Sequence, residues 1–86
     1  MERYFFHIDY GEFSRDSEGT SLPNLRAARG AAVQLLGEIL RDAGDEFWAK
    51  PDLIVTVTDS TDLTLWTLTV SGDEAPSVSR NRALSG

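Results

Sequence analysis

The segment from Asn24 to Gly44, NLRAARGAAVQLLGEILRDAG, constrains the fold most, because its apolar residues recur with helical spacing. At about 100° per residue they form one stripe. Its members are Leu25, Ala28, Ala32, Leu36, Ile39 and Ala43, widened by Val33, Leu35 and Leu40. Asn24 is a favoured N-cap, since its side chain can accept a hydrogen bond from a first-turn amide, and Gly44 is a suitable stop. We predict one helix over residues 25–43, about 28 Å long.

Alternating residues on both sides of this helix indicate strands. In residues 4–10, four aromatic or branched apolar side chains point one way and Phe5, His7 and Asp9 point the other. Residues 19–22 predict a short second strand, antiparallel to the first. Residues 53–58 and 63–70 are rich in Val, Ile, Thr and Leu and predict two more strands, with a turn between them.

The order of these elements predicts an α+β fold of ββαββ type. It consists of a four-stranded, mainly antiparallel sheet with one helix across one face. Residues 45–52 are a connector, because Pro51 disfavours a helix there. We expect residues 1–70 to form a single domain and residues 71–86, which lack periodicity, to form a flexible tail without regular structure.

Composition excludes several classes of function. The chain has 86 residues and no cysteine, which rules out disulfides, thiolate metal sites and a cysteine nucleophile. Its net charge of −6, from 14 acidic and 8 basic residues, argues against nucleic-acid binding, which needs a positive surface. No apolar run approaches the roughly 20 residues that cross a bilayer. We expect a cytoplasmic protein without a membrane partner.

His7 is the one histidine and therefore the first candidate for chemistry. A Ser-His-Asp arrangement needs an activated serine and a shielded pocket, and the sequence has no G-x-S-x-G elbow. One histidine without cysteine is a poor zinc site, and the acidic turns lack the ligand spacing of a calcium loop. We predict a structural role for His7 and no metal or cofactor. The alternative is a hydrolase that uses His7 with a nearby acid.

Arg29 falls inside the apolar arc of the predicted helix, about 40° from Leu25. An arginine at such a place lays its stem on the core and needs an acceptor for its guanidinium. We predict a structural ion pair with Glu18 or Asp16, in the loop before the helix. The alternative is an anion site formed by Arg26, Arg29 and the helix N-terminus.

The two tryptophans are interpreted as core residues, as is usual for large aromatic side chains in a small protein. Trp66 shares a strand face with Leu68 and Val70, so it is assigned inward. Trp48, beside Phe47, is expected to close one end of the core.

The sheet face away from the helix is the predicted interface. Its candidate residues are Phe5, His7, Ile54, Leu63 and Leu65. A face with this much apolar surface calls for a partner. We predict a symmetric homodimer, the commonest closed assembly, and keep a different protein partner as the alternative.

Four short motifs occur in a fixed order. They are R-Y-F-F-H at Arg3–His7, D-x-E-G at Asp16–Gly19, L-P-x-L-x-A-A-R at Leu22–Arg29 and V-x-V-x-D at Val55–Asp59. Together they resemble a family of small, single-domain bacterial proteins classed as a domain of unknown function. In that family the turn after V-x-V-x-D often reads D-x-D-G, whereas this chain has D-S-T-D. The resemblance implies no activity, cofactor or substrate.

The β-β-α-β order, the R-Y start and the E-G in the second strand have a more distant likeness to the partner-binding domain of HicB-type antitoxins. We therefore predict a non-catalytic module for protein interaction or self-association. A HicB-like antitoxin or regulatory partner, and the His7 hydrolase, are the alternatives.

Overall fold

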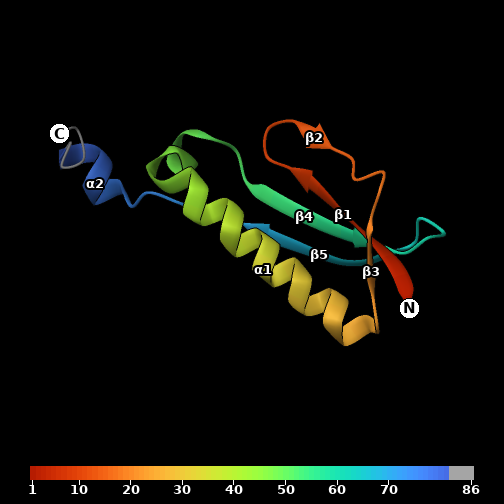
Figure 1. The fold of residues 1–86 in the computed structure, drawn as a ribbon. Coiled ribbons are helices and arrows are strands. Elements are labelled where there is room, and N and C mark those ends of the chain that lie inside the picture. Colours follow the sequence, from red (N-terminus) through yellow and green to blue (C-terminus); the bar gives the residue numbers. More distant parts are fainter. Residues whose placement is uncertain (82–86) are drawn as a thin grey trace.

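The computed structural model of the chain describes residues 1–81, and it places one long helix across an antiparallel sheet (Figure 1). In chain order the elements are β1 (Glu2–Asp9), β2 (Phe13–Ser14), β3 (Thr20–Leu22), α1 (Leu25–Ala43), the 3-10 helix η1 (Gly44–Ala49), β4 (Leu53–Thr58), β5 (Thr64–Val70) and α2 (Pro76–Asn81). The predicted α+β class and the antiparallel sheet with one main helix are confirmed.

The sheet has the order β2-β1-β4-β5, and β3 also pairs with the outer edge of β1. β2 pairs with the C-terminal end of β1, at Ile8 and Asp9, and β3 pairs with its N-terminal end, at residues 2–4. The predicted strand at 19–22 is therefore present as β3. The sequence does not predict β2, because a strand of two residues inside a polar loop has no measurable alternation.

α1 has the bounds that its caps predict. Asn24 Oδ1 accepts a hydrogen bond from the amide of Ala27 at 2.8 Å, and Gly44, with φ +56°, donates its N–H to Leu40 O. The connector was predicted without a helix, and η1 corrects this. Pro51 forces an extended conformation only on its neighbour Lys50, at φ −110° and ψ 160°, and leaves the preceding residues free to turn.

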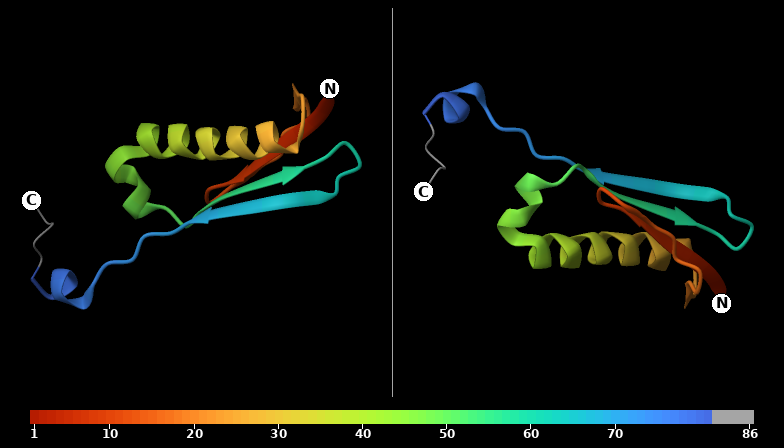
Figure 2. Two further views of the ribbon diagram at one scale, coloured as in Figure 1. Left: turned by 90° about the horizontal axis from the view of Figure 1, so that it is seen from below. Right: turned by 90° about the horizontal axis from the view of Figure 1, so that it is seen from above.

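The core lies between α1 and the sheet, and both views in Figure 2 show α1 on one side of the strands. Its buried cluster is Tyr4, Ala28, Ala32 and Val57, with Phe6, Leu22, Leu65, Trp66 and Leu68 packed against it. Ala28 and Ala32 are completely buried, and their small size lets the helix approach the sheet closely. Trp66 therefore points inward as predicted.

Trp48 does not close the core, contrary to the prediction, because 63 % of its surface is exposed. Its ring meets Phe47 edge-on, and Phe47 stacks on Tyr10. The chain passes these rings again after β5. A Cβ on Gly72 would lie 2.6 Å from Trp48 Cζ3, so only a glycine fits at this crossing without a shift of the ring.

After β5 the chain leaves the body of the molecule and forms α2 (Figures 1 and 2). The longest dimension is 53 Å, against 20 Å and 19 Å for the other two. Residues 71–75 have no regular structure, as predicted for the tail, whereas residues 76–81 are helical. The rest of the predicted tail, residues 82–86, lies outside the described residues. Within residues 1–81, no helix is both long and apolar enough to cross a membrane.

Candidate functional site

His7 lies on the open face, which is the face of the sheet away from α1, and only 2 % of it is exposed. Its Nδ1 accepts a hydrogen bond from the amide of Asp16 at 3.1 Å, and its Nε2 lies 3.0 Å from Thr58 Oγ1. Because a backbone amide can only donate, Nδ1 carries no proton. The neutral ring therefore has its proton on Nε2 and donates it to Thr58.

Two phenylalanines enclose this histidine. The Phe5 ring lies nearly parallel to the imidazole at 6.5 Å between centroids, and the Phe13 ring lies at 6.1 Å from it. Phe13 comes from β2, so the chain after β1 folds back over His7. The imidazole is thus buried and has a hydrogen-bond partner at each nitrogen, as a structural polar group should.

Asp16 fills the gap in the sheet between β2 and β3. Its Oδ2 accepts from the amide of Phe6 at 3.1 Å, and its Oδ1 accepts from the amides of Glu18 and Gly19 at 3.1 Å and 3.0 Å. Partial burial acts to raise the pKa of Asp16. The hydrogen bonds from these three amides outweigh burial and hold the pKa of Asp16 below its usual value. Asp16 thus replaces a missing strand partner of β1.

The predicted ion pair between Arg29 and Glu18 or Asp16 is not formed in the described part of the chain. The stripe that faces the sheet is centred near Ala28 and Ala32, and Arg29, about 100° around the helix from Ala28, is exposed. The oxygens of Asp16 are used by amides instead. An exposed ion pair joins Arg15 to Asp62 at 3.1 Å.

The five predicted interface residues do not gather into one apolar patch. Phe5 and His7 lie together on the open face, where their register partners on β4 are Thr58 and Thr56. The next strand continues this row with Thr67, so the face is rich in threonine.

Of the other three interface candidates, Ile54 shares this open face, because it lies two residues before Thr56 on β4. Ile54 is half-buried opposite Asp9. Leu65 has no register partner on β4, because Val57 pairs with Trp66 and Thr58 pairs with Thr64. At this β-bulge Leu65 packs against the core. Leu63 precedes β5 and is 61 % exposed.

The outer edge of β5 is a more prominent feature. β5 ends the sheet, and within residues 1–81 it pairs with β4 alone. Its sequence, TLWTLTV, has seven residues, no charge, no glycine and no proline. Natural proteins usually protect such edges with charges, prolines or covering segments, because an unprotected edge is a template for another strand.

The backbone groups of β5 that face outward follow from one hydrogen bond at the opposite side of the sheet. The amide of Phe6 donates to Asp16, which lies beyond β1, so this amide points away from β4. Successive amides along an antiparallel strand point to opposite sides, so the amide of His7 points at β4. The amide of Thr56, the residue on β4 that pairs with His7, points at β1. The amides on either side of Thr56, that of Val55 among them, therefore point at β5.

The same alternation continues into β5. Val55 pairs with Leu68, so the N–H and C=O of Leu68 point at β4. Those of Thr67 and Thr69 consequently point outward. The amide of Asp59 donates a hydrogen bond to Leu63 O. This agrees with the alternation, because Asp59 and Val55 are four residues apart and their amides therefore point to the same side, toward β5. The edge thus presents two donors and two acceptors without a strand partner in residues 1–81.

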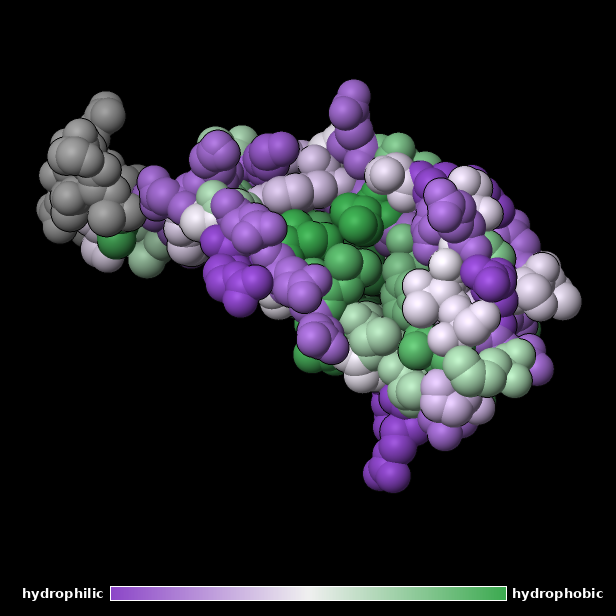
Figure 3. Space-filling model, viewed as in Figure 1, coloured by the Kyte–Doolittle hydropathy of each residue, from purple (hydrophilic) through white to green (hydrophobic). Residues whose placement is uncertain are grey.

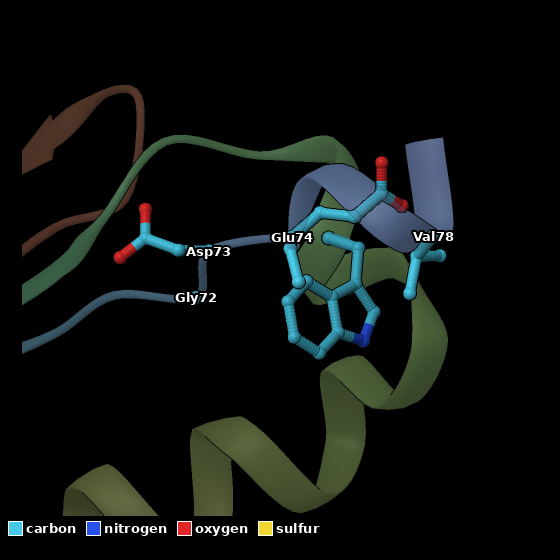
Figure 4. A pocket seen from close by; sticks show the side chains of 6 residues that line it. Gly72, Asp73, Glu74 and Val78 are labelled. Carbon is cyan, nitrogen blue, oxygen red and sulfur yellow. The ribbon is translucent and has the colours of Figure 1, made fainter. Parts of the chain in front are cut away.

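Two of the hollows in the surface of residues 1–81 are larger than 300 Å³. An apolar hollow of about 330 Å³ lies between α1 and the strands and is lined mainly by Phe6, Ile8, Ala31 and Leu35. Figure 3 shows hydrophobic surface in this region. The other hollow, of about 380 Å³, lies where the chain after β5 passes Trp48. There the carboxylates of Asp73 and Glu74 point to opposite sides, as Figure 4 shows. Residues 1–81 hold no group of three or more side chains suited to bind a metal.

These features define a small α+β domain with one long helix and one free sheet edge. A family model described as "Domain of unknown function (DUF6894)" matches residues 3–71, and the chain belongs to this family. The match runs from the second residue of β1 through β5 and ends before α2. It confirms the resemblance to a family of unknown function. The comparisons with curated proteins and with solved structures found no match, so the likeness to HicB-type antitoxins stays a prediction.

Proposed function

We propose that the chain is a protein-interaction module without catalytic activity, which binds by accepting a strand at the outer edge of β5. The observation that carries this proposal is the unpaired edge itself, with the backbone groups of Thr67 and Thr69 directed outward. In this mode of binding the main-chain hydrogen bonds supply affinity, and the alternating side chains supply selectivity.

The environment of His7 supports a non-catalytic role. A general base needs a nitrogen that can reach a substrate proton. Both nitrogens of His7 are engaged within the chain, and Phe5 and Phe13 cover the ring. A hydrolase built on His7 would have to break one of these hydrogen bonds and displace Phe13 before each turnover.

A strand-shaped peptide tests the proposal. The probe alternates threonine and valine, carries terminal lysines for solubility, and is N-methylated along one edge so that it cannot assemble with itself. We expect it to shift the amide resonances of Thr67 and Thr69 in the ¹⁵N-labelled chain. These shifts should exceed those of residues at the β1 edge.

Thr67→Pro is the critical variant, and Thr67→Val is its matched control. Proline removes an N–H that β4 does not use, so the internal ladder stays intact while the outer edge loses a donor and gains a bulky ring. We expect Thr67→Pro to abolish peptide binding and Thr67→Val to keep it. Equal binding by the two variants would show that the peptide does not add to β5.

A further inference from the structure

We infer that the strand accepted by β5 is β5 of a second copy of this chain, in a symmetric antiparallel pair centred on Leu68. This inference rests on the proposed function and names the partner. The regular part of β5 runs from Trp66 to Val70, between the bulge at Leu65 and the end of the strand. Leu68 is its midpoint, so a twofold axis there uses the whole regular segment.

The outward backbone groups complement themselves in this register. About a twofold axis at Leu68, Thr67 of one copy lies opposite Thr69 of the other. Each such pair joins residues whose N–H and C=O groups both face outward, so it exchanges two hydrogen bonds. The symmetric arrangement satisfies the outward groups of both threonines in both copies. A shift by one residue would place outward groups opposite groups that already bond to β4.

The side chains agree with the same register. On the helix side, Leu68 meets Leu68 of the second copy and Trp66 meets Val70, and all three are only half-buried in the single chain. Aromatic and β-branched cross-strand pairs of this kind stabilise a sheet. On the open face, Thr67 meets Thr69. The strand has no charged residue, so no like charges meet within the paired segment.

Charge sets the expected salt dependence. Antiparallel pairing brings the acidic turn Asp59–Asp62 of one copy toward Asp73 of the other, and each chain carries a net charge of −6. Salt screens this repulsion over about 10 Å at 0.1 M. Self-pairing should therefore become tighter when salt is raised. A lysine-rich strand from another protein would bind more weakly under the same change.

Sedimentation of the full chain is the first test. A short edge pairing belongs among small interfaces, below about 1,200 Å², so we expect a reversible monomer–dimer equilibrium at tens to hundreds of micromolar. Raising NaCl from 20 to 200 mM should shift it toward dimer. Thr67→Pro should stay monomeric with unchanged circular dichroism, and Thr67→Val should dimerise. A dimer that persists in Thr67→Pro overturns the inference.

A disulfide tests the register, because the chain has no cysteine of its own. At the twofold axis the two Leu68 Cα atoms form a non-hydrogen-bonded pair about 4.5 Å apart, inside the range that a disulfide spans. We expect Leu68→Cys to give a covalent dimer under mild oxidation. Thr69→Cys, which faces Thr67, should give little. If Leu68→Cys does not fold, a mixture of Thr67→Cys and Thr69→Cys chains should cross-link while neither does alone.

The outcomes separate this inference from the proposed function. A chain that stays monomeric at all concentrations but binds the strand peptide at Thr67 and Thr69 overturns the second-copy partner and leaves the proposed function standing. A chain that neither dimerises nor binds the peptide overturns both. Equal cross-linking of Leu68→Cys and Thr69→Cys overturns the register.

Discussion

Asp16 stands at the one place along the outer edge of β1 where neither β2 nor β3 is paired with it. Its carboxylate bonds three backbone amides, and its own amide bonds His7. Asp16 and His7, nine residues apart in the sequence, are therefore parts of one hydrogen-bonded cluster. They hold the loop between β2 and β3 onto the open face, and neither has the freedom that chemistry on a substrate requires.

Removing the carboxylate of Asp16 should destabilise the fold. Asp16→Ala leaves the amide of Phe6 without its acceptor, and we expect a loss of about 1–3 kcal/mol in the free energy of unfolding at pH 7, measured by urea denaturation. Glu18→Ala is the matched control. Glu18 is exposed and its hydrogen bonds use its backbone, so its substitution should change stability by less than about 0.5 kcal/mol.

The same variant has a predicted pH dependence. The pKa of Asp16 is lowered in the folded chain, chiefly because the three amide bonds outweigh partial burial. A lowered pKa stabilises the fold above the unfolded value, about 3.9 for aspartate, and this contribution is lost as the pH falls through the folded pKa. The stability difference between the parent chain and Asp16→Ala should therefore shrink below about pH 4. A difference that is equal at pH 3 and pH 7 would contradict the role of the charged form.

The predicted environment of Arg29 is wrong, because it rests on the helical wheel alone. The helical wheel gives angles between residues but does not give the direction of the sheet. An arc centred on Leu25 includes Arg29, whereas the actual contact is centred near Ala28 and Ala32 and leaves Leu25 54 % exposed at the helix end. Asp16 is predicted as a partner of Arg29, but its partners are backbone amides, which a sequence pattern does not reveal.

At the scale of elements, spacing and caps predicted α1 and β4 to the residue, because each has a strong local signal. The sequence does not predict β2 and η1, because both elements are short and depend on contacts with distant residues. The sequence does not predict the bulge at Leu65 for a different reason. Whether β4 and β5 stay in register depends on the pairing of both strands, and the sequence of one strand does not determine it.

The N-cap of α1 provides a test at this scale. Asn24→Ala removes the acceptor for the amide of Ala27, and we expect a loss of about 1 kcal/mol in the free energy of unfolding. Asn24→Ser should restore most of it. Gln34→Ala, on the exposed side of the same helix, is the control and should be neutral or slightly stabilising. Equal effects at positions 24 and 34 would show that the cap does not contribute.

At the scale of the whole molecule, the chain is longer than a compact body of its size. Its radius of gyration is 15.9 Å, whereas about 12 Å is expected for 86 residues. The segment after β5 extends away from the body of the molecule (Figure 2), and it passes close to Trp48 at Gly72. The core residues lie between Tyr4 and Leu68, and the family match ends at residue 71.

A chain that ends at Asp73 should therefore keep the stability of the full chain to within about 0.5 kcal/mol. In X-ray scattering its radius of gyration should fall toward about 12 Å. The comparison is best made with Thr67→Pro in both chains, so that self-association does not change the scattering. The same radius of gyration with and without the segment would mean that it folds back onto the body in solution.

The blocked edge of β1 has a consequence for stoichiometry. A sheet with two receptive edges adds copies at both ends, and each addition exposes a fresh edge, so growth continues into a ribbon. Here one side is occupied by β2 and β3, and Asp16 binds the amide of Phe6 that would otherwise be open. Pairing through β5 consumes the receptive edge that residues 1–81 still offer in each molecule. The proposed assembly therefore stops at two, and the carboxylate of Asp16 helps to keep a chain with an uncharged edge strand from polymerising.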